Sequence, residues 1–312
     1  MEQLNSTVVT TISSSSPGHP PPSSQDFRAL VTVVVLSLCS ILGIPGNIAV
    51  IILRPNWQQM SSLSQSLMLN LAVADLLNLI TLPLWIHAFL HGWSFGLLAC
   101  KLISYLIYCC IHCCLLTVIA LSLQRYLQVV HGKKWFQQRG QKRLLALLWL
   151  VAIILSIPVL VDRQIISVRN LPQCESVYSS LTEQVALLLE ETVMGIVSVS
   201  VVVFAYIRLK RKVDRAALFN NPQTTCLITS IIVTFFIFWV PFLIVNMLGL
   251  AAIFSKNEKL MKFCTDKKSI FRALVFLNSS LDPFLYAFAS RNFCTACLKQ
   301  EHKNNCSTSQ EI

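Results

Sequence analysis

Charged side chains are scarce in this chain. Lysine, arginine, aspartate and glutamate together make up 12% of its 312 residues, whereas hydrophobic residues make up 54%. A soluble domain usually carries about a quarter charged residues. The chain is therefore too apolar for a soluble single domain, and its composition favours a protein that lies in a lipid bilayer.

The sequence also lacks the motifs of several function classes. No Cys/His spacing resembles a zinc site, no glycine-rich phosphate loop is present, and no nucleophile can be combined with a base and an orienting partner. These absences argue against an enzyme and against a bound cofactor. There is no internal repeat, no discontinuous pair of helices and no lysine in the last apolar stretch, which argues against a transporter or pump.

The excess of positive charge has a different explanation from that in soluble proteins. A formal net charge of +11 would suggest nucleic acid binding in a soluble domain. Here the cations are shared among loops that would lie beside anionic lipid. We therefore expect membrane lipid, and no nucleic acid, as their partner.

Long apolar stretches dominate the chain. A helix needs roughly 20 apolar residues to cross the hydrocarbon core. Seven stretches meet this requirement, at about residues 28–54, 63–90, 98–130, 143–162, 184–207, 223–252 and 269–290. The sequence predicts an all-α fold, a bundle of seven transmembrane helices, with its termini on opposite sides of the membrane.

Lysine and arginine gather in the loops after the third and fifth stretches and in the C-terminal tail. Short basic loops stay in the cytoplasm, so we expect a multi-pass protein of the plasma membrane with an extracellular N-terminus. One predicted outer loop is also basic, and it contains Lys256, Lys259, Lys262, Lys267 and Lys268. These lysines would attract an anionic ligand by long-range steering, or they only solvate the loop.

Three segments follow from this topology. Residues 1–27 are rich in serine and proline, a composition typical of a disordered tail, and Asn5 begins a glycosylation acceptor sequence. Residues 28–290 form the predicted transmembrane domain. Residues 291–312 form a cytoplasmic end.

Few carboxylates fall within the predicted membrane helices: Asp75, Glu190, Glu191 and Asp282. An ionisable group at mid-bilayer is costly, so each of them suggests a function. Asp75 and Asp282, together with Asn278 and Ser279, form a polar set that can hold water or a small hard cation such as sodium. The alternative is a hydrogen-bonded structural network without an ion.

Prolines and cysteines mark further features. Pro83, Pro158, Pro241 and Pro283 fall inside apolar stretches and should bend them. Trp239 lies two residues before Pro241, so it is either part of a bistable hinge or only a core residue. Most cysteines lie inside the stretches, but Cys100 and Cys174 lie on the predicted oxidising side, where we expect them to be bridged. Cys264 is then free or paired with Cys39.

Several motifs point to a family. They are GIPGN at 43–47, LAVAD at 71–75, Cys100, Arg125 with Tyr126, Trp149, FWVP at 238–241 and DPFLY at 282–286. In order and spacing the chain resembles the rhodopsin-like (class A) G-protein-coupled receptors over nearly its whole length. The resemblance implies a receptor in which ligand binding activates a heterotrimeric G protein.

The resemblance also implies an activation switch, formed by Gln124, Arg125, Tyr126, Tyr206, Trp239, Pro241, Asp282, Pro283 and Tyr286. Arg125 would end the third span and contact the G protein on activation. The acidic residue that normally precedes this arginine is replaced by Gln124. A neutral amide forms no ion pair, so the resting state should be less stable by about 1 kcal/mol, and basal activity should be raised. The alternative is that other cytoplasmic contacts compensate for the lost ion pair.

Within this family, PLWIHAFLHGWSFG, LSLQRYLQVV, PVLVDRQ, LLLEE and PFLIVN resemble the leukotriene B4 receptors, and the glutamine–arginine pair resembles their second subtype. The resemblance implies a dihydroxy fatty acid as ligand. Arg163 would pair with its carboxylate, unless Asp162 neutralises this arginine. His87, Tyr105, Glu190 and Asn246 would orient its hydroxyls, whereas His112 is expected to be an interior histidine.

The alternative ligand is a peptide chemoattractant. Receptors for such peptides tend to have acidic outer loops, whereas the outer loops here are basic. On the cytoplasmic side, RNFCTACLKQ resembles the short amphipathic helix that follows the seventh span, with Cys294 and Cys297 as palmitoylation candidates. An inhibitory-type G protein and arrestin are the expected cytoplasmic partners.

Overall fold

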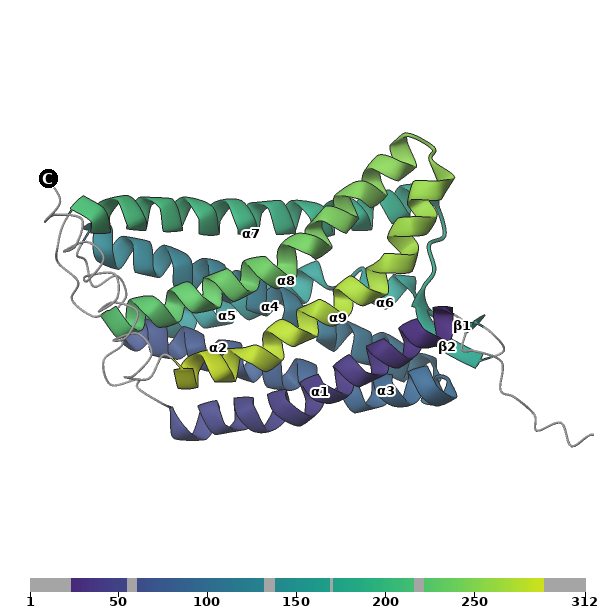
Figure 1. The fold of residues 1–312 in the computed structure, drawn as a ribbon, viewed down its shortest axis with the longest axis horizontal. Coiled ribbons are helices and arrows are strands. Elements are labelled where there is room, and N and C mark those ends of the chain that lie inside the picture. The colour runs from purple at the N-terminus through teal and green to yellow at the C-terminus, as the bar shows by residue number, and fades with distance from the viewer. Residues whose placement is uncertain (1–23, 55–60, 132–137, 169–170, 216–221, 289–312) are drawn as a thin grey trace, which may run out of the picture.

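The computed structural model describes residues 24–54, 61–131, 138–168, 171–215 and 222–288. Its helices run back and forth along one axis and pack side by side (Figure 1). They are α1 (Ser24–Leu53), α2 (Ser62–Leu79), α3 (Leu82–His91), α4 (Gly96–His131), α5 (Gln138–Leu155), α6 (Val159–Asp162), α7 (Leu181–Arg215), α8 (Pro222–Phe254) and α9 (Glu258–Phe288). The predicted helical bundle is confirmed, with α2 and α3 forming one pass and α5 and α6 another.

Two of the predicted proline bends coincide with breaks between helices. Pro83 lies in the first turn of α3, after a short interruption at Ile80 and Thr81. Pro158 separates α5 from α6. In both places proline has no N–H to continue the preceding helix. Pro241 and Pro283 lie inside α8 and α9, as does Pro45 inside α1.

Six helical segments are long and apolar enough to cross a membrane: 30–53, 62–91, 96–128, 140–162, 181–208 and 229–254. The seventh pass, α9, contains a shorter apolar segment over residues 273–285. Large apolar side chains cover the outside of the bundle, such as Ile41, Leu98 and Ile237, which are 66%, 71% and 60% exposed. This arrangement suits a bundle whose solvent is lipid.

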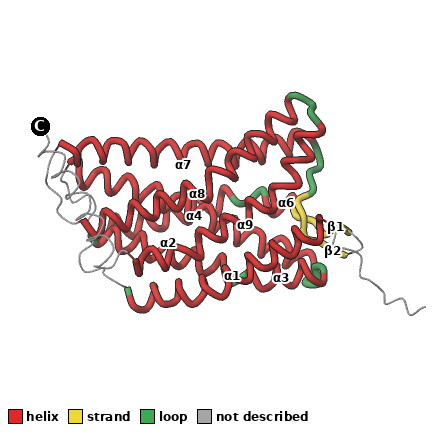
Figure 2. Tube along the Cα trace, viewed as in Figure 1, coloured by secondary structure: helices red, strands yellow, loops and turns green. Residues whose placement is uncertain are grey.

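The described residues contain one pair of strands, which the sequence did not predict. Strands β1 (Arg163–Val168) and β2 (Leu171–Ser176) pair antiparallel, and Ile165 lies opposite Cys174. Figure 2 shows them at the tip of the bundle beside α3. We call this tip the hairpin end. The first residue of β1 follows directly on α6, so the hairpin is attached rigidly to the bundle.

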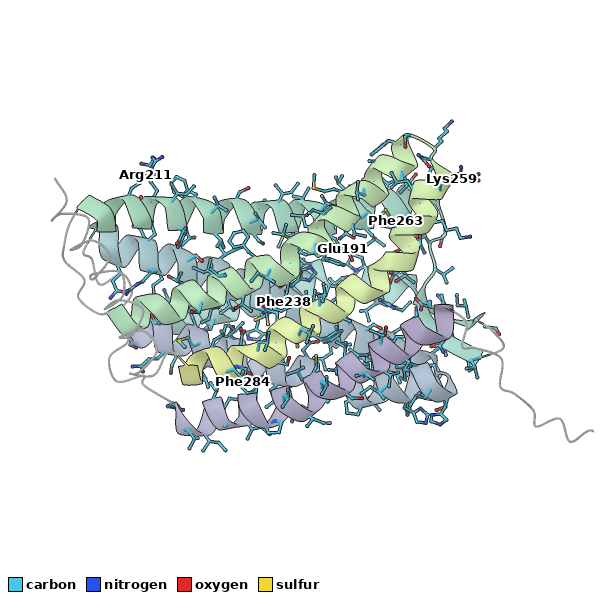
Figure 3. The ribbon with its side chains drawn as sticks, viewed as in Figure 1. Glu191, Arg211, Phe238, Lys259, Phe263 and Phe284 are labelled. Atoms are coloured by element: carbon cyan, nitrogen blue, oxygen red, sulfur yellow. A yellow bond between two sulfur atoms is a disulfide. The ribbon has the colours of Figure 1, made fainter. Side chains whose placement is uncertain are left out.

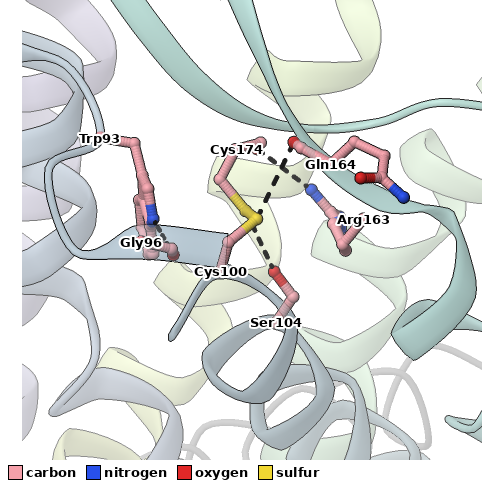
Figure 4. Close-up of a disulfide and its surroundings, with 7 residues drawn as sticks. All are labelled: Trp93, Gly96, Cys100, Ser104, Arg163, Gln164 and Cys174. Carbon is pink, nitrogen blue, oxygen red and sulfur yellow. Dashed lines mark hydrogen bonds between the residues drawn. A yellow bond between two sulfur atoms is a disulfide. The ribbon is translucent and has the colours of Figure 1, made fainter. Parts of the chain in front are cut away.

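The hairpin is fastened to the helices by covalent and polar contacts. Cys100 at the start of α4 is bridged to Cys174 of β2, as expected (Figure 4). The backbone N–H of Trp93 donates to the carbonyl of Pro172 at 2.6 Å, and the Gln173 side chain donates to the carbonyl of Ala88 at 3.1 Å. The hairpin therefore stays at one position over the end of the bundle.

Cys39 and Cys264, the other two cysteines considered for a bridge, are free and buried. Cys264 lies in the part of α9 near the hairpin end, beyond its apolar segment. Burial raises the pKa of the Cys264 thiol, which makes the reactive thiolate rarer at neutral pH.

Candidate functional site

A cavity of about 190 Å³ lies inside the bundle near the hairpin end. Most of its wall is apolar, with Trp85, Ile107, Leu115, Trp239, Phe242 and Phe276 among the lining residues. Its polar wall residues include Ser104, Tyr108, His112, Arg163, Glu175 and Glu191. An apolar cavity with a few convergent polar groups is the usual form of a small-molecule site.

Arg163 brings a positive charge to this cavity. It is the first residue of β1 and is 5% exposed. Its Nη1 donates to the carbonyl of Cys174 at 3.4 Å, and its guanidinium lies 5.9 Å from the ring centroid of Tyr108. Its Nε has no hydrogen-bond partner in the part of the chain that the structure describes. A buried guanidinium with donors to spare is suited to bind an anion.

Glu191 of α7 brings a negative charge to the cavity wall; Figure 3 labels this residue inside the bundle. The hydroxyl of Tyr108 donates to Glu191 Oε1 at 3.3 Å. The amide of Asn246 donates to Glu191 Oε2 at 3.0 Å. These bonds join α4, α7 and α8, and they leave a set of groups that can both donate and accept hydrogen bonds at the cavity wall.

His112 lies one turn from Tyr108 on α4 and also lines the cavity. Its Nδ1 is 2.9 Å from the hydroxyl of Ser156, and its Nε2 is 3.5 Å from Glu190 Oε1. The ring thus lies between Ser156, in the turn after α5, and Glu190 of α7. This agrees with the expectation of an interior histidine, yet it also puts one face of the ring on the cavity.

The structure places the other predicted ligand residues differently. His87 is exposed and packs on the rings of His91 and Phe95, at 4.9 and 5.3 Å. The hydroxyl of Tyr105 donates to the carbonyl of Ile153 on α5 at 3.2 Å. Glu190 lines a separate cavity of about 20 Å³ between α4, α6 and α7. None of these three lines the main cavity, and Asn246 reaches it through Glu191.

The correction has a simple geometric reason. Successive residues on a helix point about 100° apart, so Glu190 and Glu191 face different neighbours. The spacing along α4 allows either Tyr105 or Tyr108 to face the cavity. Only the rotation of α4 against α5 and α7 decides which ring enters the cavity. Sequence reasoning therefore missed Tyr108, and it considered Glu191 without assigning it a role.

Trp239 closes the cavity on the side away from the hairpin. It lies midway along α8, is 8% exposed, and stacks on Phe235 with ring centroids 5.7 Å apart. Phe242, one turn further, meets it edge to face at 6.1 Å. With Pro241 in the same turn, an aromatic cluster occupies the place where α8 lacks a backbone hydrogen bond.

A second polar cluster lies deeper in the bundle, among α1, α2, α4 and α9. Asp75 and Asp282 are both 0% exposed, and Asn278 and Ser279 are 6% and 4% exposed. The Cys114 thiol donates to Asp75 Oδ1 at 3.4 Å. The amide of Asn47 donates to the carbonyl of Ser279 at 3.0 Å.

Several oxygens of this cluster accept no hydrogen bond from the described residues: Asp75 Oδ2, Asn278 Oδ1, and both carboxylate oxygens of Asp282. Buried oxygen atoms without donors are costly unless water or a cation meets them. Oxygen is also the ligand that small hard cations prefer. The donor set thus fits the sodium ion that the sequence suggested.

At the opposite end of the bundle, Gln124 is bound to the start of α2. Its Nε2 donates to the hydroxyls of Ser61 and Ser64 at 2.6 and 2.8 Å, and Ser64 donates back to its Oε1 at 3.0 Å. Ser61 is also the N-cap residue of α2. The amide therefore takes part in capping a helix, a role that the sequence did not indicate.

Arg125, the next residue, is 7% exposed despite its charge. Tyr126 packs on Phe204 of α7 with ring centroids 5.9 Å apart, and Tyr206 is 38% exposed. The side chain of Tyr286, and all of Asn5, Cys294 and Cys297, lie outside the residues that the structure describes. The predictions for these four residues, and for the segments 1–27 and 291–312, stay predictions.

A helical membrane bundle with an internal cavity near one end and a buried arginine near the other has the organisation of a transmembrane receptor. Comparison with known proteins makes this specific. Residues 46–286 match the family described as 7 transmembrane receptor (rhodopsin family). The chain belongs to this family, whose members are receptors without enzymatic activity, and it is a multi-pass protein of the plasma membrane.

Its relatives include receptors for chemically different ligands. Leukotriene B4 receptor 1 of Homo sapiens is 30% identical over 288 residues, which cover 89% of this chain and 82% of that protein. C-X-C chemokine receptor type 2 of Oryctolagus cuniculus is 29% identical over 288 residues, covering 88% and 79%. C-X-C chemokine receptor type 1 of the same species is 29% identical, covering 88% and 80%.

Proposed function

We propose that this receptor binds a lipid carboxylic acid, leukotriene B4 or a related hydroxy fatty acid, in the cavity at the hairpin end. The observation that carries the proposal is the buried Arg163 guanidinium, whose Nε has no partner among the described residues, in the wall of a mostly apolar cavity. A single cation beside an apolar slot matches a fatty acid carboxylate followed by a hydrocarbon chain.

Arg163 and Asp162 are neighbours in the chain, and both residues are buried. Arg163 bonds to a carbonyl oxygen and lies over an aromatic ring. Asp162 is separately buried at the end of α6, where its backbone carbonyl accepts from Val177 N–H at 2.8 Å. Arg163 Nε, which has no hydrogen-bond partner among the described residues, can donate to a ligand carboxylate.

The polar groups around Glu191 suit the hydroxyls of such a ligand. Glu191 accepts hydrogen bonds, and the Tyr108 hydroxyl can donate or accept them. Arg163 and these groups line one cavity, so one ligand can contact both. These groups favour a hydroxy acid over a plain fatty acid as the ligand.

Ligand binding would favour a conformation that activates a heterotrimeric G protein, by population shift. The ligand cavity would face outward, so that the N-terminus is extracellular and Arg125 lies at the cytoplasmic face. Basic cytoplasmic loops and the resemblance to chemoattractant receptors support an inhibitory-type G protein, with arrestin as a second partner. The exposed Lys256, Lys259 and Lys262 beside the hairpin end would steer an anion toward the cavity.

We further propose that sodium binds among Asp75, Asn278, Ser279 and Asp282. The support is the set of buried oxygens without donors in the described residues. An ion there would bridge α2 and α9 and stabilise the arrangement seen in this structure.

The test is G-protein activation in cells that express the chain, with leukotriene B4 titrated against wild type, Arg163→Ala and Arg163→Lys. Arg163→Ala should lose the response or shift it by at least tenfold, since a charged hydrogen bond contributes about 1.5–3 kcal/mol. Arg163→Lys keeps the charge without the two-pronged geometry of arginine, so its potency should lie between those of wild type and Arg163→Ala. Surface expression is measured in parallel.

A wild type that activates the G protein without ligand but ignores leukotriene B4 would discard this ligand. The search would then turn to other lipid acids and to peptide chemoattractants. Equal potency on all three receptors would keep the ligand and reject Arg163 as its anchor.

A further inference from the structure

A small void lies beside the main cavity, between α4, α7 and α8. Its volume is about 10 Å³, room for about one water-sized or methyl-sized group. Leu115, Glu191, Trp239 and Phe242 line both the void and the main cavity. We call this void the branch; the residues that it shares with the main cavity place it beside that cavity, at the level of Trp239.

Residue 195 on α7, which lines this void, is glycine. A Cβ built at this position would lie 2.8 Å from Leu243 Cδ1. Real Cβ atoms essentially never come so close to another heavy atom, so even alanine would push Leu243 or fill the branch. Glycine costs helix stability relative to alanine, and at this position it leaves room for the Leu243 side chain, which also lines the void.

The surroundings of the branch are apolar apart from one carboxylate. Val199, Phe235 and Leu243 complete its wall. Glu191 already accepts hydrogen bonds from Tyr108 and Asn246. A hydrocarbon group is thus better suited to the branch than a polar group.

We infer that the branch receives the methyl end of the ligand chain, and that Gly195 sets how long this chain can be. The inference rests on the proposed function. Arg163 holds the carboxylate at the hairpin, so the hydrocarbon chain runs toward Trp239 at the far side of the cavity. The chain end then meets the branch, which has room for about one further carbon.

The experiment compares leukotriene B4 with analogues shortened by one and two carbons at the methyl end. Wild type should lose about fourfold in potency with the first carbon removed, the factor that corresponds to about 0.8 kcal/mol for one buried methylene. Gly195→Ala should bind full-length leukotriene B4 about fourfold more weakly than wild type does. It should bind the shortened analogue with the same affinity as wild type. Its potency would no longer depend on the last carbon.

Gly249→Ala is the matched control. It makes the same chemical change in a buried helical position, but the nearest atom to its new Cβ is Leu188 Cδ1 at 4.0 Å. It should keep the wild-type dependence on chain length. Leu243→Ala is the inverse variant: it enlarges the branch and should favour an analogue one carbon longer. This variant decides the matter if Gly195→Ala does not reach the cell surface.

Three outcomes would overturn the inference. Equal shifts for all chain lengths in Gly195→Ala would mean that the branch does not contact the chain end. A change in basal activity or maximal response, without any dependence on chain length, would assign the space to movement of Trp239 instead. A wild type that responds to none of the fatty acids would reject the proposed ligand class together with this inference.

Discussion

At the level of single residues, Gln124 shows how a substitution in a family motif can acquire a new partner. The amide bonds to two hydroxyls at the N-terminus of α2. These neutral hydrogen bonds tie α4 to α2, but they give Arg125 no compensating charge. Because the neutral Gln124 cannot form the ion pair with Arg125 that an acidic residue here could form, the inactive conformation should be less favoured than in relatives with an acidic residue at this position.

We therefore expect Gln124→Asp to lower basal G-protein activation. An ion pair with Arg125 would stabilise the resting state by about 1 kcal/mol, or about fivefold in the equilibrium. Gln124→Asn is the control, since it matches aspartate in size without its charge. Basal signalling is measured in cells at equal surface expression. Equal basal signalling of the wild type, Gln124→Asp and Gln124→Asn would show that the charge is irrelevant.

The ligand residues show what sequence can and cannot give at this scale. Arg163 could be selected from its position next to an apolar stretch, and the structure puts it at the cavity. Tyr105 and Tyr108, or Glu190 and Glu191, could not be ranked, because their order depends on helix rotation. That rotation is set by packing against α5 and α7, which involves residues more than 40 positions away in the chain.

At the level of elements, α1 and α9 approach each other at two glycines. A Cβ at Gly46 would lie 2.9 Å from Pro283 Cβ, and a Cβ at Gly43 would lie 2.9 Å from Ser280 Cβ. The Pro283 ring is rigid and cannot move aside alone. The two helices would have to separate, which would disturb the neighbouring polar cluster around Asp282.

Gly46→Ala should accordingly destabilise the receptor. Alanine improves helix propensity at any helical position, so Gly249→Ala serves as the reference for that gain. Relative to this reference, overpacking at Gly46 should cost about 1–3 kcal/mol. The measurement is the apparent melting temperature of the purified receptor in detergent. Identical melting of the two variants would mean that α1 and α9 separate without cost.

The helices themselves could be predicted because each apolar stretch is long enough to span a bilayer. The hairpin could not. Its residues, RQIISV and LPQCES, alternate only weakly in polarity. They are held as strands by one another and by contacts of Cys174, Pro172 and Gln173 with α3 and α4. These strands depend on contacts with residues far away in the chain, so the local sequence does not predict them.

At the level of the whole molecule, three features lie in series along the bundle. The cavity with Arg163 is near the hairpin end, the Asp75–Asp282 cluster lies deeper, and Arg125 lies toward the opposite end. The middle cluster contacts α1, α2, α4 and α9 through Asn47, Cys114 and Ser279. An ion held there would favour one packing of these helices and so affect both ends.

Sodium should therefore raise the stability of this packing, and Asp75 should be required for the effect. At a sodium concentration ten times the dissociation constant, the gain would be about 1.4 kcal/mol. The apparent melting temperature of the purified receptor should rise in sodium chloride relative to N-methyl-D-glucamine chloride at equal ionic strength. Asp75→Asn should abolish the difference, because it removes one of the two carboxylates that would hold the ion.

Asp162→Asn makes the same change at another buried aspartate, outside the cluster, and should keep the sodium dependence. Because coupling between sites is reciprocal, a ligand that favours a different packing should lose affinity in sodium, and only in receptors with Asp75 intact. Melting of wild type that is the same in both salts would leave water, rather than an ion, as the partner of these oxygens. A sodium effect that survives Asp75→Asn would move the ion to another site in the bundle.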